Sequence, residues 1–131
     1  MDLQEGVERL AALSGVDHRD PYFDLDGDLL VHIFFTEVFN RFALPANDSG
    51  DGAALRSISE LCDVMIDSDD EALVNALQVS FLELACHFRP RTDPLLLALG
   101  PKCWTVIADG HADYAQRVHA VRPLPDRPSS A

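Results

Sequence analysis

Residues 29–42, LLVHIFFTEVFNRF, carry apolar side chains around most of a helix. Apart from His32, the polar positions form one narrow stripe of Thr36, Glu37, Asn40 and Arg41. Apolar residues spaced three and four apart favour a helix over a strand, and a helix with so wide an apolar face must be surrounded on most sides. We therefore predict a helix from about Asp26 or Asp28 to Phe42, packed against several neighbours.

The same periodicity recurs along the chain. We predict helices over residues 3–13, 53–66, about 69–88 and 94–100, and a last helix that begins at Pro101. Asp2 is placed to cap the first helix, and Ser68 with Glu71 three residues later has the pattern of a capping box. Residues 44–52 contain one proline and two glycines, so we expect a flexible loop there.

Five to six amphipathic helices joined by short connections predict an all-α fold. The pattern leaves two architectures open, a compact bundle and a short α-solenoid-like stack of helix pairs. A length of 131 residues suits one domain. We place this helical domain at residues 1–122 and expect the Pro- and Ser-rich residues 123–131 to be a disordered tail.

The charge is strongly negative and unevenly distributed. The formal net charge is −12, and residues 1–88 hold 18 of the 22 acidic side chains with only 4 of the 10 basic ones. Such a surface repels nucleic acid phosphates and anionic lipids, and it steers basic proteins toward itself. No apolar run approaches a membrane span, and the N-terminus lacks a signal-peptide layout. We expect a cytoplasmic protein that binds neither nucleic acid nor membrane.

The sequence offers no recognisable metal or cofactor motif. Cys62, Cys86 and Cys103 lie in apolar helical contexts without CxxC spacing, which predicts reduced, buried thiols. The run Asp24-Leu25-Asp26-Gly27-Asp28 resembles the start of a calcium loop. Neither possible register supplies both the glycine at position 6 and the carboxylate at position 12 that such a loop requires. We therefore expect no cofactor.

Catalytic patterns are equally sparse. The chain lacks GxSxG and any Gly-rich phosphate loop, and we predict that it is not an enzyme. One alternative remains open: Glu83 and His87 are one helical turn apart and could act together in a helical pocket if burial perturbs the glutamate. The only basic cluster, formed by Arg89, Arg91 and Lys102, could contact an anion, but we expect it to pair with the acidic part of the chain.

Two acidic clusters remain as candidate binding residues. Asp24, Asp26 and Asp28 precede the second predicted helix. Asp67, Asp69, Asp70 and Glu71 precede the fourth, with Asp63 one turn upstream. A carboxylate at a helix N-terminus stabilises the helix by about 0.5–2 kcal/mol, but one cap needs only one side chain. The surplus charge has two explanations, a surface that docks arginines and lysines of a partner, or general acidity.

Tyr22 and Phe23 lie beside the first of these clusters. Tight protein complexes combine a charged rim with a desolvated, often aromatic, anchor. Both side chains are therefore candidate partner contacts. The alternative is that they pack beneath the second helix as a hydrophobic staple.

A resemblance to known proteins covers residues 68–104. It is carried by the acidic cap Ser68-Asp69-Asp70-Glu71, by Phe81-Leu82-Glu83-Leu84, and by Leu99-Gly100-Pro101-Lys102 before Trp104. With these features the chain resembles a family of small all-helical bacterial proteins of largely unknown function. Similar small proteins are encoded as immunity proteins beside polymorphic toxins.

The resemblance implies a cytosolic antitoxin that occludes a cognate toxin domain. Immunity proteins of nuclease toxins are commonly acidic, because they meet surfaces built to bind phosphate. The expected partner is thus a basic protein, most specifically a toxin. A non-inhibitory adaptor or chaperone for a secreted effector would use the same helical surface and remains an alternative.

Overall fold

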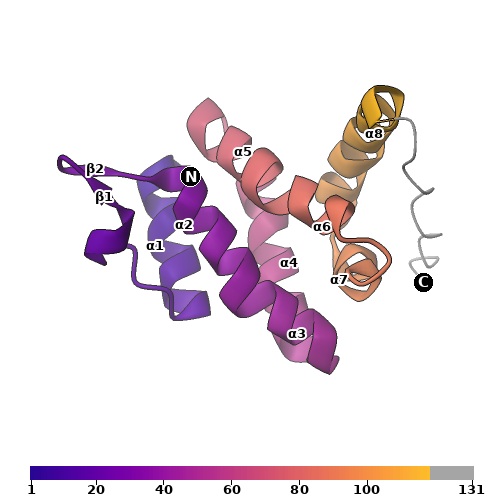
Figure 1. The fold of residues 1–131 in the computed structure, drawn as a ribbon, viewed down its shortest axis with the longest axis horizontal. Coiled ribbons are helices and arrows are strands. Elements are labelled where there is room, and N and C mark those ends of the chain that lie inside the picture. The colour runs from indigo at the N-terminus through magenta and orange to yellow at the C-terminus, as the bar shows by residue number, and fades with distance from the viewer. Residues whose placement is uncertain (119–131) are drawn as a thin grey trace.

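Helices dominate the computed structural model, which describes residues 1–118, with side chains up to residue 110 (Figure 1). This confirms the all-α class. The described helices form six rods. Two of these rods contain an internal π turn. The rods are α1 (Leu3–Ser14), α2–η2–α3 (Val31–Val38, Phe39–Ala43, Leu44–Ser49), α4 (Gly52–Ile66), α5–η3–α6 (Glu71–Leu77, Gln78–Leu82, Glu83–His87), α7 (Asp93–Ala98) and α8 (Pro101–Val118). The boundary expected at residue 122 and the predicted tail lie outside the described residues.

Helix α4 is the centre of the fold. It packs against α1, α3, α5, α7 and α8. A solenoid repeat contacts only its neighbours along the stack, so this arrangement is a bundle around one helix. The core beside α4 is rich in aromatic residues, and Phe34, Phe35, Phe39 and Phe81 are all fully buried. No helix within residues 1–118 is long and apolar enough to cross a bilayer.

The loop predicted over residues 44–52 is wrong, because Leu44–Ser49 is helix α3 and continues the rod of α2. The π turn η2 makes this possible. The N–H of Leu44 bonds to the carbonyl of Phe39, five residues back, so the helix widens just before Pro45. A widened turn accommodates a proline that has no N–H to donate and whose ring would otherwise crowd the preceding turn. Gly50, with φ 70°, then ends the rod.

The predicted start of the second helix at Asp26 or Asp28 is also wrong, because the helix begins at Val31. Strands β1 (Asp24–Leu25) and β2 (Asp28–Leu29) form an antiparallel hairpin that pairs Asp24 with Leu29 and Leu25 with Asp28. The two turn residues, Asp26 and Gly27, have φ of 53° and 88°. Positive φ at both central positions is the requirement of a type I′ hairpin turn, which Asp-Gly satisfies with little strain. The hairpin follows a short 3₁₀ turn, η1 (Pro21–Phe23).

The helix ends are held by specific side chains. Asp2 caps α1 as predicted, accepting the Glu5 N–H, and Gly15 ends this helix with φ 76°. The capping box at Ser68 is not formed, because α5 begins later and Asp70 is its cap. The Ser68 hydroxyl instead donates to the Met1 carbonyl and accepts the N–H of Asp70. Thr92 likewise gives its hydroxyl hydrogen to the Ala85 carbonyl and leaves α7 without a cap of its own.

Candidate partner-binding surface

The second group of acidic residues, Asp63, Asp67, Asp69, Asp70 and Glu71, is called here the α4–α5 cluster. Two of its members hold the start of α8. Asp63 Oδ1 accepts the backbone N–H of Cys103 at 3.0 Å. Asp67 Oδ2 lies 2.8 Å from Lys102 Nζ, and this ion pair raises the pKa of the lysine. Both carboxylates therefore have partners within the chain, across an interface between α4 and α8.

Asp70 caps two helices at once. Its Oδ2 atom accepts the N–H of Leu3 at 2.8 Å, and its Oδ1 atom accepts the N–H of Ala72 at 3.1 Å. The bond from Leu3 is the largest of the interactions that hold the pKa of Asp70 below its ordinary value, followed by those from the start of α5. One carboxylate thus joins the first turn of α1 to the first turn of α5.

These contacts account for most of the surplus charge in the α4–α5 cluster. Asp69 and Glu71 are its two exposed members that form no ion pair or side-chain hydrogen bond with another described residue. Local capping could not explain several carboxylates at one helix start. Asp63 and Asp70 cap helices that are remote in sequence, and Asp67 forms an ion pair, so three of the five carboxylates have a partner. The α4–α5 cluster consequently offers a partner less free charge than its composition suggests.

The first acidic group, Asp24, Asp26 and Asp28, is called the hairpin cluster, and its three side chains are all exposed. The hairpin projects from the edge of the helical bundle, at the far end of the molecule from α7 and α8 (Figure 1). Asp24 Oδ1 accepts the N–H of Gly27 at 2.9 Å, which stabilises the turn. None of the three carboxylates forms an ion pair with a side chain among residues 1–110. The nearby Arg19 is paired with Asp17.

Exposed apolar side chains accompany the hairpin cluster. Tyr22 is 60% exposed and Leu25 is 58% exposed. Since Leu25 is paired with Asp28 across the hairpin, these two side chains share one face of it. This face therefore combines an apolar contact with a carboxylate.

Phe23 has a different environment from its neighbour Tyr22. It is only 1% exposed, and its ring packs edge-on against Phe34 at a centroid distance of 5.5 Å. The alternative that this side chain packs beneath the second helix is therefore correct for Phe23, which is unavailable as a contact in the folded protein. The sequence did not identify Leu25 as a candidate contact, because a helix start was predicted beside it. An Asp-Gly pair between alternating residues is nevertheless a strong hairpin signal.

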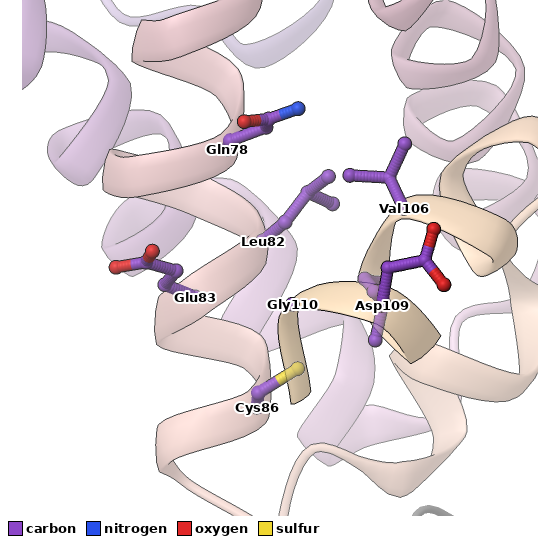
Figure 2. Close-up of a pocket in the computed structure, with 8 residues that line it drawn as sticks. Gln78, Leu82, Glu83, Cys86, Val106, Asp109 and Gly110 are labelled. Carbon is purple, nitrogen blue, oxygen red and sulfur yellow. The ribbon is translucent and has the colours of Figure 1, made fainter. Parts of the chain in front are cut away.

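A pocket of about 350 Å³ lies between the rod containing η3 and α6 and helix α8 (Figure 2). Glu83 lies on its margin, but its carboxylate points away from α8. Glu83 and His87 are both exposed, and His87 is not among the described lining residues. The buried pair that the enzymatic alternative requires is therefore not found. Burial raises the pKa of the Cys86 thiol to about 11, so this pocket residue is protonated at neutral pH.

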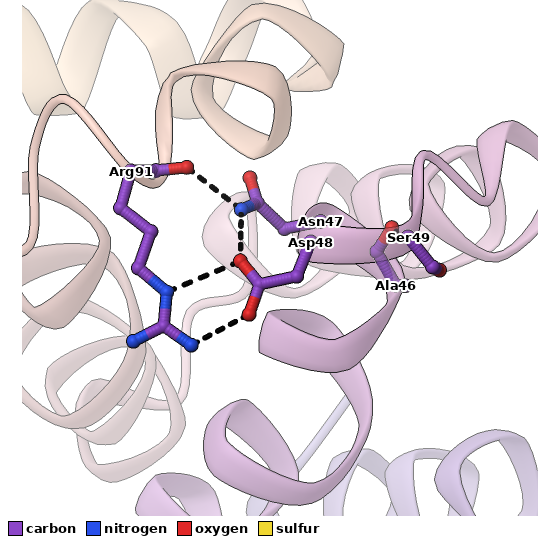
Figure 3. A network of polar contacts seen from close by, with 5 residues as sticks. All are labelled: Ala46, Asn47, Asp48, Ser49 and Arg91. Atoms are coloured by element: carbon purple, nitrogen blue, oxygen red, sulfur yellow. Dashed lines mark hydrogen bonds and ion pairs between the residues drawn. The ribbon is translucent and has the colours of Figure 1, made fainter.

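Two residues of the basic cluster pair with the acidic part of the chain, as predicted: Lys102 with Asp67 and Arg91 with Asp48, whereas Arg89 pairs with Asp93 in α7. Arg91 contacts both carboxylate oxygens of Asp48, at 3.1 and 2.5 Å, and this pairing lowers the pKa of the aspartate (Figure 3). The adjacent Asn47 is buried. Its amide donates to the Arg91 carbonyl at 2.8 Å and accepts the N–H of Leu95 at 2.9 Å. A side chain from α3 thus supplies the missing cap of α7.

No family model, curated protein or solved structure matches this chain. Among the described residues, no group of three or more His, Cys, Asp or Glu side chains is arranged to hold a metal ion. The geometry and charge of the surface are therefore the features that indicate a function.

Proposed function

We propose that this protein binds a basic protein partner and masks it, using the hairpin cluster together with Tyr22 and Leu25. The observation that carries the proposal is the state of the three hairpin carboxylates, which are exposed and have no ion-pair partner among the described side chains. In the α4–α5 cluster, by contrast, Asp63, Asp67 and Asp70 are engaged by backbone N–H groups or by a basic side chain. The hairpin carboxylates are left to interact with a partner.

The apolar side chains beside these carboxylates can supply the affinity that charge alone does not provide. Electrostatic attraction mainly increases the rate and selectivity of encounter, whereas affinity comes from a few well-packed, desolvated contacts. Tyr22 and Leu25 are large, exposed and adjacent to the acidic turn. They are suited to enter a pocket on the partner while the carboxylates contact arginines or lysines around it.

The most specific form of the proposal is an immunity protein that neutralises a bacterial polymorphic or secreted toxin. The acidic character of residues 1–88 and the resemblance over residues 68–104 support it. A toxin that acts on a phosphate-bearing substrate presents cationic groups, and a cluster of carboxylates on a rigid turn is complementary to them. Bound there, the hairpin would exclude the substrate.

The test compares two variants with equal charge change. One neutralises the hairpin cluster (Asp24→Asn, Asp26→Asn, Asp28→Asn), and the control neutralises three exposed carboxylates elsewhere (Glu60→Gln, Asp69→Asn, Glu71→Gln). Asparagine tolerates the positive φ of Asp26 and retains the acceptor for the Gly27 N–H. Each protein is used as bait in host lysate, and captured proteins are identified by mass spectrometry.

The expected result is a basic protein that the wild type and the control retain and the hairpin variant loses. Equal losses in both variants would show nonspecific charge attraction and would overturn the proposal, as would capture of no basic protein. An activity assay of the captured protein then distinguishes an inhibitor from an adaptor. An immunity protein abolishes the activity, whereas an adaptor leaves it intact.

A further inference from the structure

The pocket between α6 and α8 is a second concave feature, separate from the hairpin. The hairpin and the helices α6 and α8, which line the pocket, lie on opposite sides of the molecule (Figure 1). Its volume of about 350 Å³ falls within the range of roughly 300–1,000 Å³ that is typical of small-molecule sites. Leu82 and Val106 point toward each other across it, and the Cys86 thiol is directed toward α8 (Figure 2). The interior is therefore mainly apolar, and the Gln78 amide is the polar group beside it.

Gly110 forms part of the pocket wall, in the interior of helix α8. A glycine in the interior of a helix makes the helix less stable, by about 0.5–1 kcal/mol, than an alanine at the same position. Close packing is the usual reason to keep one, but a Cβ atom built at Gly110 meets no described atom within 4 Å. No contact in the described part of the chain requires a glycine here. Among the described atoms, the missing side chain therefore leaves open space beside the pocket.

Charge at the margin selects the kind of molecule that can enter. Glu83 and Asp109 lie on opposite sides of the pocket, one on α6 and one on α8, and both are exposed. Their carboxylates are directed outward, away from the apolar interior (Figure 2). Neither forms an ion pair with a side chain among residues 1–110. An anionic ligand is repelled at this margin, whereas a cationic group at the mouth is attracted.

We propose that this pocket binds a small ligand with a compact apolar body and a cationic end, such as an arylalkyl amine. The apolar body occupies the space between Leu82 and Val106 and beside Gly110. The ammonium group stays at the mouth, within the field of Glu83 and Asp109. This site is independent of the hairpin, so neutralising the hairpin cluster leaves it unchanged.

The test uses two probes of similar shape and opposite charge, phenethylammonium and hydrocinnamate, titrated into the full chain and followed by amide NMR shifts. We expect saturable shifts around Leu82 and Ile107 with the cation, and an affinity at least about tenfold weaker for the anion. The double variant Glu83→Gln, Asp109→Asn should reduce this preference to less than about threefold. Failure of both probes to saturate, or equal affinity for both in the wild type, would overturn the proposal.

Two variants locate the binding site. Gly110→Leu fills the pocket and should weaken binding of the cation by at least about tenfold, whereas Gly110→Ala should raise the thermal stability of the helix and weaken binding much less. If Gly110→Leu does not fold, Val106→Phe fills the same space from another position on α8. Unchanged affinity in a folded pocket-filling variant would place the probe elsewhere and refute the assignment.

Discussion

Asp63, near the end of α4, accepts the N–H of Cys103 in the first turn of α8 and so caps a helix 40 residues further along the chain. The approach is close because the residue before α8 is a glycine. A Cβ atom at Gly100 would lie 2.6 Å from Asp63 Cγ. Gly100 has no side chain with which to cap α8 itself, and the carboxylate from α4 fulfils that role.

Removing this remote cap should destabilise the protein. We expect Asp63→Ala to lower the free energy of unfolding by about 1 kcal/mol, within the usual effect of losing a helix cap. Urea denaturation followed by circular dichroism measures the change. Asp69→Ala is the control, since Asp69 is exposed and caps no helix. Similar losses for both variants would argue that Asp63 contributes only as one charge among many.

We expect a larger loss of stability when Asn47 is replaced, because this residue is buried and forms two hydrogen bonds to the backbone around α7. Asn47→Ala would leave a buried N–H and a carbonyl without partners, and we expect a loss of about 2–3 kcal/mol in unfolding free energy. Asp48→Ala provides the comparison, since it removes the surface ion pair with Arg91 and one hydrogen bond from the Asn47 amide but leaves both bonds of Asn47 to the backbone, and it should have a much smaller effect. The two variants are compared by urea denaturation. The prediction fails if the order is reversed.

The stability of the fold should depend on pH through Asp70. Its folded pKa lies below the unfolded value of about 3.8, so its stabilising contribution is complete above that value and is lost as the pH falls through the folded pKa. The isosteric variant Asp70→Asn lacks the titrating group. Wild type should therefore be more stable near pH 6, and the difference between the two proteins should shrink below about pH 4. Urea midpoints across this range measure it. A difference that is independent of pH would contradict the role of the charge.

Leu25 tests the proposed partner surface through an apolar contact. We expect Leu25→Ser to weaken binding of the captured partner by about tenfold or more, because truncating an interface anchor costs more than 1 kcal/mol. Val64, on α4 away from the hairpin, is 51% exposed, so Val64→Ser is the matched control. Surface plasmon resonance would report the loss mainly as faster dissociation. Equal effects in both variants would exclude Leu25 as an anchor.

Local patterns were sufficient to predict most of the helices. The periodicity of residues 53–66 corresponds to α4, and Asp2 caps α1 as expected. The predicted secondary structure was wrong where a local sequence pattern is compatible with two structures. Pro45 and Gly50 indicated a loop, but a π turn before the proline allows the helix to continue to Ser49. Helix continuity of this kind depends on packing around the rod, which the sequence pattern does not specify.

The candidate site was predicted only in part, because its residues are distinguished by tertiary contacts. Asp63 and Asp26 are alike in sequence terms, each belonging to an acidic cluster near a predicted helix start. In the fold, one is engaged by a backbone N–H from a helix 40 residues away, and the other lies on an exposed turn. The spacing of residues in the sequence does not show which of the two carboxylates is engaged in the fold and which is exposed. Tyr22 stays a predicted partner contact, and its side chain is exposed, whereas the exposure of Leu25 depends on a hairpin that the predicted helix start did not allow.

The type I′ turn also determines how far the charge of the hairpin acts. At a helix N-terminus, a partial positive charge of about half an elementary unit would offset part of each carboxylate's field. A two-stranded sheet has only a small net dipole, so Asp24, Asp26 and Asp28 act with their full charge on the surroundings. Around a narrow protrusion this field extends into solvent over roughly one Debye length, about 8 Å at physiological ionic strength. An approaching cationic surface is thus oriented toward the tip of the hairpin before any contact forms.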